Sequence, residues 1–125
     1  MKLLKLKHTI AMLLAFCMFS CATAPTSYQN PVIRGDVADP SIIRIDNTYY
    51  ACGTSSEWAP FYPMFSSKDL INWTQTGHVF NKKPKWTSSS FWAPELFYHN
   101  GKVFCYYSAR RASDGISCIG VATAD

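Results

Sequence analysis

Acidic residues, helical periodicity and long apolar runs are all scarce in this chain. The 125 residues contain eight Asp and Glu against twelve Lys and Arg, yet the basic residues are too scattered to predict a nucleic-acid surface. The five cysteines show no metal-ligand spacing. After residue 30 no apolar 3.6-residue period is visible, and residues 10–19 are too few to span a bilayer, which needs about 20. These absences argue against a nucleic-acid-binding protein, a zinc module and a membrane-spanning helix.

The first 20 residues have the features of an export signal. Three lysines precede the apolar stretch 10–19, and no acidic residue occurs among residues 1–20. The run Met18-Phe19-Ser20-Cys21 resembles a bacterial lipobox, in which the signal is cut before a lipid-bearing cysteine. An ordinary secretory signal with an incidental cysteine is the alternative. We expect a signal peptide over 1–20, lipidation at Cys21 and a short linker over 21–29. The protein is then exported and anchored by lipid to a bacterial membrane, at the outer membrane or cell surface.

Three cysteines follow the predicted anchor: Cys52, Cys105 and Cys118. In an exported protein a disulfide between Cys105 and Cys118 is geometrically conceivable, because both fall on segments expected to be neighbouring strands. Free buried thiols that act as small apolar side chains are the favoured interpretation.

The rest of the chain has the pattern of an all-β protein rich in aromatic residues. Aromatic residues make up 15% of the sequence, with four Trp and seven Tyr. Short runs of Val, Ile, Tyr and Phe alternate with turn clusters such as Asp46-Asn47, Asn72, Asn100-Gly101 and Ser113-Asp114-Gly115, and Asp69 is also expected to be a turn residue. Asn100-Gly101 is the strongest hairpin signal, because a type I′ turn needs two residues that tolerate positive φ.

The sequence also contains an internal repeat. Residues 39–54 (DPSIIRIDNTYYACGT) match residues 93–108 (APELFYHNGKVFCYYS) at an offset of 54, and residues 66–69 match 122–125 at an offset of 56. The second offset places Asp125 where the first repeat has Asp69. An all-β unit of about 50 residues that recurs in this way is typical of a propeller blade. A β-sandwich is the alternative, but it does not require this spacing.

Asp39 is the first candidate for a functional residue. It stands at the expected start of an inner strand, where the second repeat has Ala93. A repeat that accepts alanine at this position has no structural need for a charge there, which favours a functional role for Asp39. The alternative is that Asp39 closes a turn ahead of Pro40.

Three motifs in order resemble the beginning of glycoside hydrolase family 43: NPVIRGDVADPSIIRIDNTYY, SKDLINW and FWAPELFYHNGKVFCYYS, over residues 30–125. The resemblance implies the first two blades of an incomplete five-bladed β-propeller. It also implies hydrolysis of β-xylosides or α-L-arabinofuranosides in plant polysaccharides with inversion, and it assigns the role of general base to Asp39. The acid and the carboxylate that tunes its pKa are expected beyond residue 125, so that residues 1–125 alone should be inactive.

Three further residues are expected to bind a pentose-containing oligo- or polysaccharide. Trp58 and Trp92 can present indole faces to a sugar ring, although both could instead pack between blades. Glu95 is two residues beyond Ala93, so the strand period suggests the channel side, where it could bind a substrate hydroxyl or support the water network. No cofactor is expected, and a calcium ion in the channel stays open because its ligands would lie in other blades. A non-catalytic carbohydrate-binding surface lipoprotein, or another five-bladed propeller glycosidase or phosphorylase, remains the alternative.

Overall fold

The computed structural model describes residues 27–125 as a chain of antiparallel strands. The predicted signal peptide and Cys21 lie outside the described residues. Within residues 27–125 there is no helix, and hence no helix that could cross a membrane. The strands are β1 (Ser41–Ile45), β2 (Thr48–Cys52), β3 (Phe61–Ser67), β4 (Trp73–Phe80), β5 (Thr87–His99), β6 (Lys102–Arg111) and β7 (Ser117–Ala124). The predicted all-β class is confirmed.

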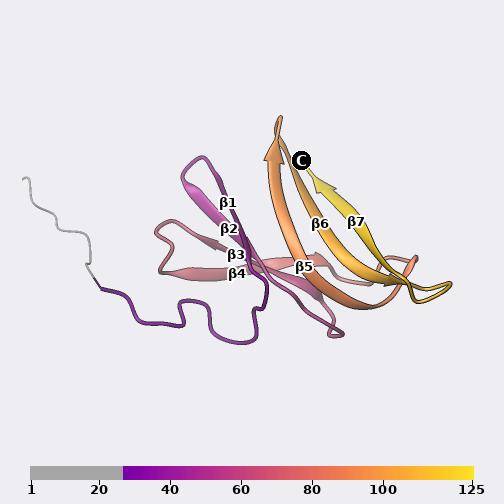
Figure 1. Ribbon diagram of the computed structural model, residues 1–125. Coiled ribbons are helices and arrows are strands. Elements are labelled where there is room, and N and C mark those ends of the chain that lie inside the picture. The colour runs from indigo at the N-terminus through magenta and orange to yellow at the C-terminus, as the bar shows by residue number, and fades with distance from the viewer. Residues whose placement is uncertain (1–26) are drawn as a thin grey trace, which may run out of the picture.

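The strands form two sheets with simple up-and-down order. Sheet 1 has the order β1-β2-β3-β4 and sheet 2 the order β5-β6-β7. Figure 1 shows the two sheets side by side, with the irregular segment before β1 running along one end. Strand β5 contacts β1, β2 and β3, so the first strand of sheet 2 packs against sheet 1. This arrangement of consecutive antiparallel sheets is that of adjacent propeller blades.

The first hairpin of each sheet has the same register, as the repeat predicts. Ile42 pairs with Ala51 in sheet 1, and Leu96 pairs with Cys105 in sheet 2, so both partners are displaced by the offset of 54. The hairpin turns agree in backbone conformation as well. Asp46 has a φ of 52° and Asn100 a φ of 49°, the left-handed region that both residue types tolerate. The hairpin at Asn100-Gly101 is therefore confirmed.

The third strand departs from the predicted alignment by one residue. Ser66 pairs with Tyr50, and Thr123 pairs with Phe104, which gives an offset of 57 between β3 and β7 in place of 56. The alignment of Asp125 with Asp69 is therefore wrong. A sequence match of four residues at a strand end cannot fix the register, because register is set by the paired backbone and the buried face.

Side-chain contacts agree with the corrected offset. Lys68 donates a hydrogen bond from Nζ to Oγ1 of Thr48 over 2.5 Å, and Asp125 forms an ion pair with Lys102 at 3.1 Å. Thr48 and Lys102 are equivalent at the offset of 54, so Asp125 takes the place of Lys68 in the second repeat. The two sheets therefore make the same contact with different groups: a lysine and a threonine hydroxyl in sheet 1, and an aspartate and a lysine in sheet 2.

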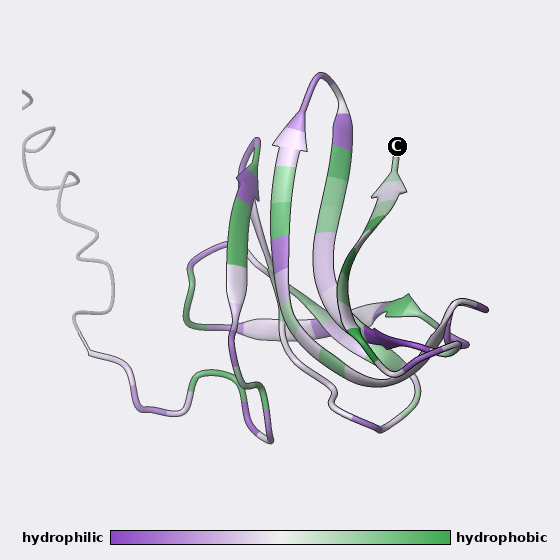
Figure 2. Cartoon of the chain, turned by 45° about the vertical axis from the view of Figure 1, so that its right-hand side comes forward, coloured by the Kyte–Doolittle hydropathy of each residue, from purple (hydrophilic) through white to green (hydrophobic). Residues whose placement is uncertain are grey.

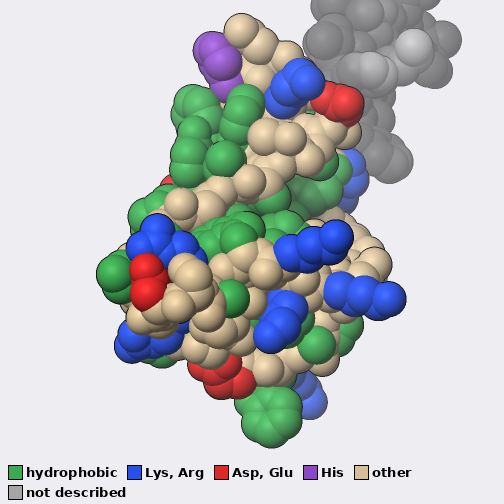
Figure 3. Space-filling view, turned by 90° about the vertical axis from the view of Figure 1, so that its right-hand side faces the viewer, with side chains coloured by type: hydrophobic (Ala, Val, Ile, Leu, Met, Phe, Trp, Pro, Cys, Tyr) green, Lys and Arg blue, Asp and Glu red, His purple; other side chains and the backbone are tan. Residues whose placement is uncertain are grey.

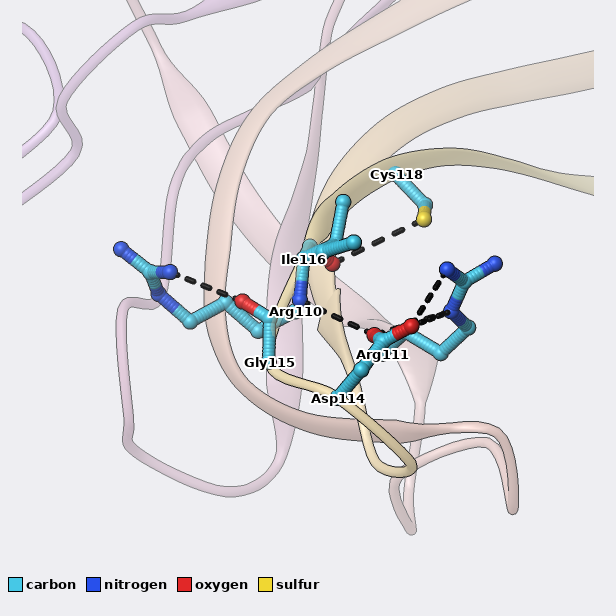
Figure 4. Close-up of polar contacts among 6 residues, drawn as sticks. All are labelled: Arg110, Arg111, Asp114, Gly115, Ile116 and Cys118. Atoms are coloured by element: carbon cyan, nitrogen blue, oxygen red, sulfur yellow. Dashed lines mark hydrogen bonds and ion pairs between the residues drawn. The ribbon is translucent and has the colours of Figure 1, made fainter.

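Aspartates close two of the predicted turns. Asp69 accepts hydrogen bonds from the backbone and side-chain nitrogens of Asn72, and these bonds hold its pKa well below the usual range. Figure 4 shows the β6–β7 turn, where Asp114 forms an ion pair with Arg111 at 2.6 Å and accepts a bond from the backbone N–H of Ile116. The Arg111 guanidinium lowers the pKa of Asp114. The predicted roles of both segments as turns are confirmed.

The core lies where the two sheets meet. Figure 2 shows that strands of both sheets carry hydrophobic segments, coloured green. The buried cluster draws on both sheets and consists of Cys52, Phe61, Tyr62, Phe91, Leu96, Cys105, Tyr107 and Ala109. The rings of Phe61 and Phe91 pack with centroids 4.1 Å apart across the interface. Aromatic burial therefore joins the two repeats into one unit.

The thiols are free, as the favoured interpretation predicted. Cys52 and Cys105 are buried, and Cys118 is half-buried. Strands β6 and β7 are neighbours, but Cys105 pairs with Ala122 and Cys118 with Ala109, so the ladder separates the two thiols. A hydrogen bond with Cys105, together with burial, raises the pKa of the Cys52 thiol, which keeps that thiol protonated.

Candidate functional site

Asp39 lies immediately before β1, on the solvent-exposed end of sheet 1. Its side chain is exposed, and its backbone has a left-handed φ of 47°. The equivalent residue Ala93 has a φ of 44°, so the same backbone bend occurs in both repeats. A positive φ at a residue other than glycine is uncommon and costs on the order of 1–3 kcal/mol. Both repeats therefore have this bend, but only the first repeat has a carboxylate at this position.

Thr54, just after β2, holds the Asp39 carboxylate. Its hydroxyl donates a hydrogen bond to Oδ2 of Asp39 over 2.9 Å, and its backbone N–H donates to the carbonyl of Ala38 over 2.9 Å. Gly53 permits this approach, since a Cβ atom there would lie 2.5 Å from Cγ1 of Val37. The other oxygen of Asp39 has no hydrogen bond to any residue of the described chain 27–125.

The loop between β2 and β3 is tied to the start of β5. Ser56 and Phe91 form an isolated β-bridge, and Oε1 of Glu57 accepts a hydrogen bond from the backbone N–H of Ser90 over 2.9 Å. These contacts hold the loop in place while Trp58 projects from it, with 80% of its surface exposed. Trp58 therefore does not pack between the sheets in this structure, and its indole is free to meet a ligand.

Trp58 borders a shallow depression of about 190 Å³. The depression is lined by Asp36, Thr54, Ser55, Trp58, Pro60 and His78, among others. It combines an indole face with hydroxyl, carboxylate and imidazole groups, which suits a polyhydroxylated ligand. Because Thr54 is part of this lining and also bonds Asp39, the depression is adjacent to the carboxylate.

Trp92 is held through its backbone. Its carbonyl accepts hydrogen bonds from the hydroxyls of Ser108, over 3.3 Å, and Tyr62, over 3.5 Å. Its side chain is 42% exposed, so part of the indole is available to a ligand. The residue after it, Ala93, donates its N–H to Oγ1 of Thr54 over 2.8 Å. Asp39 and Trp92 are thereby connected through Thr54 and Ala93.

Glu95 is exposed and lies on the outer side of sheet 2. It pairs with Tyr106 on β6, whereas the next residue, Leu96, is buried and pairs with Cys105. Successive side chains on a strand point to opposite faces. Glu95 therefore shares its face with Tyr106 and Phe97, both exposed, and faces away from the core.

The remaining titratable groups do not form a metal centre within residues 27–125. No cluster of three or more His, Cys, Asp and Glu side chains occurs in this part of the chain. His78 contacts Gln75, with its Nε2 at 3.2 Å from the amide nitrogen, and His99 stacks on Phe97 with ring centroids 6.0 Å apart. Both histidines make local polar or stacking contacts.

The sequence predicts Asp39, Trp58, Trp92 and Glu95 as site residues and gives no role to Thr54, which the structure places against Asp39. A signal for Thr54 was present, because the repeat aligns it with Ser108, another hydroxyl residue. In the structure both hydroxyls reach the positive-φ bend of their repeat: Thr54 bonds Asp39 ahead of β1, and Ser108 bonds Trp92 within β5. A small hydroxyl residue repeated at this position therefore marks the bend.

A four-stranded and a three-stranded antiparallel sheet that follow one another along the chain, with equivalent first hairpins, define the class of protein as a β-propeller. The model of glycosyl hydrolases family 43 matches residues 28–125, and the chain belongs to this family. The two sheets are its first two blades.

Sequence relatives include a beta-xylosidase of Formosa agariphila, 36% identical over 64% of this chain and 15% of its own length. An extracellular exo-alpha-(1->5)-L-arabinofuranosidase, ArbA, of Cellvibrio japonicus is 36% identical over 69% of this chain and 26% of its own. Among solved structures, the GH43 protein BlXynB of Bacillus licheniformis has a TM-score of 0.68 at 29% identity and covers 78% of this chain and 22% of its own. The chain thus spans only about a quarter or less of these proteins.

Proposed function

We propose that residues 30–125 are the N-terminal part of the catalytic propeller of an exported glycoside hydrolase that cleaves β-xylosides or α-L-arabinofuranosides with inversion. The observation that carries this proposal is Asp39, an exposed carboxylate held by one oxygen in a family 43 blade. The names of the relatives, which include xylosidases and arabinofuranosidases, support this substrate class.

Asp39 acts as the general base in this proposal. Thr54 occupies Oδ2, so the second oxygen is left to accept a proton from water. In an inverting reaction the water attacks the anomeric carbon while an acid on the opposite side of the sugar protonates the leaving oxygen. The two carboxyl groups then stand about 6.5–9.5 Å apart to leave room for the water.

The acid and the carboxylate that tunes its pKa come from later blades, and residues 27–125 alone are inactive. The outer face of sheet 2 supports this arrangement. Exposed apolar side chains gather on it, and Figure 3 views the molecule from this side. They include Phe97, Tyr106, Ile119 and Val121, with Ile119 73% exposed. An apolar sheet face of this kind fits the packing of a further blade.

The experiment that tests the function uses the complete protein on a panel of nitrophenyl pentosides. We expect release of nitrophenol from a β-xyloside or an α-L-arabinofuranoside. On an oligosaccharide substrate, proton NMR should first show the anomer of inverted configuration. Binding of pentose oligosaccharides without turnover would favour a non-catalytic carbohydrate-binding lipoprotein instead. First appearance of the retained anomer would exclude the inverting mechanism.

Trp58 and Trp92 bind the sugar by stacking, and Glu95 binds a hydroxyl of an extended substrate or supports the water network. For Trp58, we expect Trp58→Ala to raise KM roughly two- to tenfold, the size of an aromatic contact of about 0.5–1.5 kcal/mol, with kcat changed less. Trp58→Phe keeps a ring and should lose less affinity. Tyr28→Ala, at an exposed position that does not border the depression, is the matched control. An unchanged KM in Trp58→Ala would remove Trp58 from the binding site.

The anchor is a lipid on Cys21, and export is supported by the extracellular relative ArbA. Several acyl chains hold a protein on a membrane far more firmly than one chain does. We expect Cys21→Ser to move the protein from the membrane fraction to the soluble or secreted fraction, with loss of labelling by a radioactive fatty acid. Cys17→Ser, within the predicted signal, should leave both readouts unchanged. Retention of lipid label in Cys21→Ser would contradict the anchor.

A further inference from the structure

Thr54 lies between the Asp39 carboxylate and the backbone of sheet 2. Its hydroxyl oxygen accepts a hydrogen bond from the N–H of Ala93 over 2.8 Å and donates to Oδ2 of Asp39 over 2.9 Å. The direction of both bonds follows from chemistry, because a backbone N–H can only donate and an ionised carboxylate can only accept. The single hydroxyl proton of Thr54 is therefore directed to Asp39.

The surroundings fix Thr54 itself. Its side chain is 8% exposed, and its own N–H is bonded to the carbonyl of Ala38. A β-branched side chain has few χ1 rotamers available, so little freedom is left to the hydroxyl. The left-handed φ of Ala93, 44°, belongs to the bend that presents its N–H to this hydroxyl. The donor is thus held in place before any substrate binds.

The second repeat provides an internal comparison. Ser108 occupies the position of Thr54, and its hydroxyl donates to the carbonyl of Trp92, while the residue at the Asp39 position is Ala93. In sheet 2 the repeated hydroxyl therefore holds backbone alone. In sheet 1 the equivalent hydroxyl, that of Thr54, donates to a carboxylate instead. This difference distinguishes Thr54 from a residue that only stabilises the blade.

We propose that Thr54 is a positioning residue for Asp39, an inference that rests on the proposed function of Asp39 as the general base. By donating to Oδ2 of Asp39, the Thr54 hydroxyl orients the carboxylate so that the unbonded oxygen is presented to water. Through Ala93 it also couples this orientation to the backbone that carries Trp92. The proposed base Asp39 and the proposed sugar-binding residue Trp92 are then connected through the hydrogen bonds of Thr54.

The test compares Thr54→Val with Thr54→Ser in the complete protein. Valine keeps the shape of threonine and removes the hydroxyl, whereas serine keeps the hydroxyl. We expect Thr54→Val to lower kcat roughly 10- to 100-fold, since misplacement of a catalytic group by about 1 Å has an effect of this size, with KM nearly unchanged. Thr54→Ser should restore kcat to near the parent value.

A second measurement does not depend on turnover. The ¹³C chemical shift of the Asp39 carboxyl group, measured by NMR at one neutral pH, should change in Thr54→Val because the carboxylate has lost its hydrogen-bond donor, and it should return to the parent value in Thr54→Ser. If kcat and this chemical shift both match the parent while thermal stability falls, Thr54 only joins the sheets and the proposal is overturned. If the parent protein hydrolyses no glycoside, the proposed function fails, and a chemical shift that still changes in Thr54→Val retains Thr54 as the group that orients Asp39.

Discussion

Asp39→Asn in the complete protein is expected to lower kcat on an aryl pentoside by about three orders of magnitude, with binding of the sugar retained. Asparagine has nearly the same shape as aspartate, and its amide oxygen can still accept the bond from Thr54, which spans 2.9 Å in the parent. An amide cannot take a proton from water at neutral pH. The variant therefore removes the basic group and leaves the hydrogen-bonded bend in place. Steady-state kinetics and calorimetric titration with a pentose oligosaccharide measure the two effects separately.

Asp46→Asn is the matched control for this prediction. Asp46 is also an exposed aspartate with a left-handed φ, 52°, and it lies at the other end of β1. Its equivalent in the second repeat is Asn100, so the fold already accepts asparagine in this turn. We expect kcat and stability close to those of the parent. Near-normal turnover in Asp39→Asn would remove Asp39 from the role of base, and an equal loss in Asp46→Asn would show that the effect is not specific to the site.

Much of the fold could be predicted because turn residues and alternating apolar residues mark the repeat in the sequence. The hairpins around Asp46-Asn47 and Asn100-Gly101 depend on local backbone preferences, which a short sequence carries in full. The shared offset of 54 then predicts two equivalent hairpins, and the registers of β1–β2 and β5–β6 agree with it. Local signals were therefore sufficient to predict the blade and its repetition.

The parts that escaped prediction depend on contacts between distant segments. The register of β7 differs by one residue from the sequence alignment, because pairing with β6 decides it. The role of Thr54 depends on two distant residues that meet at its hydroxyl: Asp39, which lies 15 residues before Thr54, and Ala93, which lies 39 residues after it. The strand period does not tell which face of β5 is buried, so Glu95 could be placed on a face only from the pairing with β6. Tertiary proximity of this kind leaves no periodic trace in the sequence.

Tyr62 links the core of the molecule to the candidate site. Its side chain is fully buried, and its ring packs against Tyr107 with centroids 5.5 Å apart. Its hydroxyl donates to the carbonyl of Ser108 over 2.9 Å and approaches the carbonyl of Trp92 at 3.5 Å. Burial raises the pKa of Tyr62, so the hydroxyl stays protonated and remains a donor at neutral pH. A residue of sheet 1 thereby holds backbone carbonyls on both β5 and β6.

Tyr62→Ala is expected to lower the free energy of unfolding of the complete protein by about 3–5 kcal/mol, the cost of removing a buried aromatic ring and leaving a cavity. Tyr62→Phe keeps the ring and removes only the hydroxyl, so it should cost about 1–3 kcal/mol, the penalty of a buried carbonyl that loses its partner. Denaturant unfolding followed by tryptophan fluorescence measures both values. The difference between them separates the contribution of the ring from that of the hydroxyl.

Tyr28→Phe is the control for the hydroxyl, because Tyr28 is 62% exposed and precedes β1, outside the apolar face of sheet 2. A surface change of this kind should stay within about 0.5 kcal/mol. If Tyr62→Phe is as mild as this control, the bond to Ser108 does not stabilise the interface between the sheets. If Tyr62→Phe is destabilised and also raises KM for the pentoside, the hydroxyl holds the backbone of Trp92 in the position that binds sugar. The inter-sheet core and the candidate site would then depend on the same side chain.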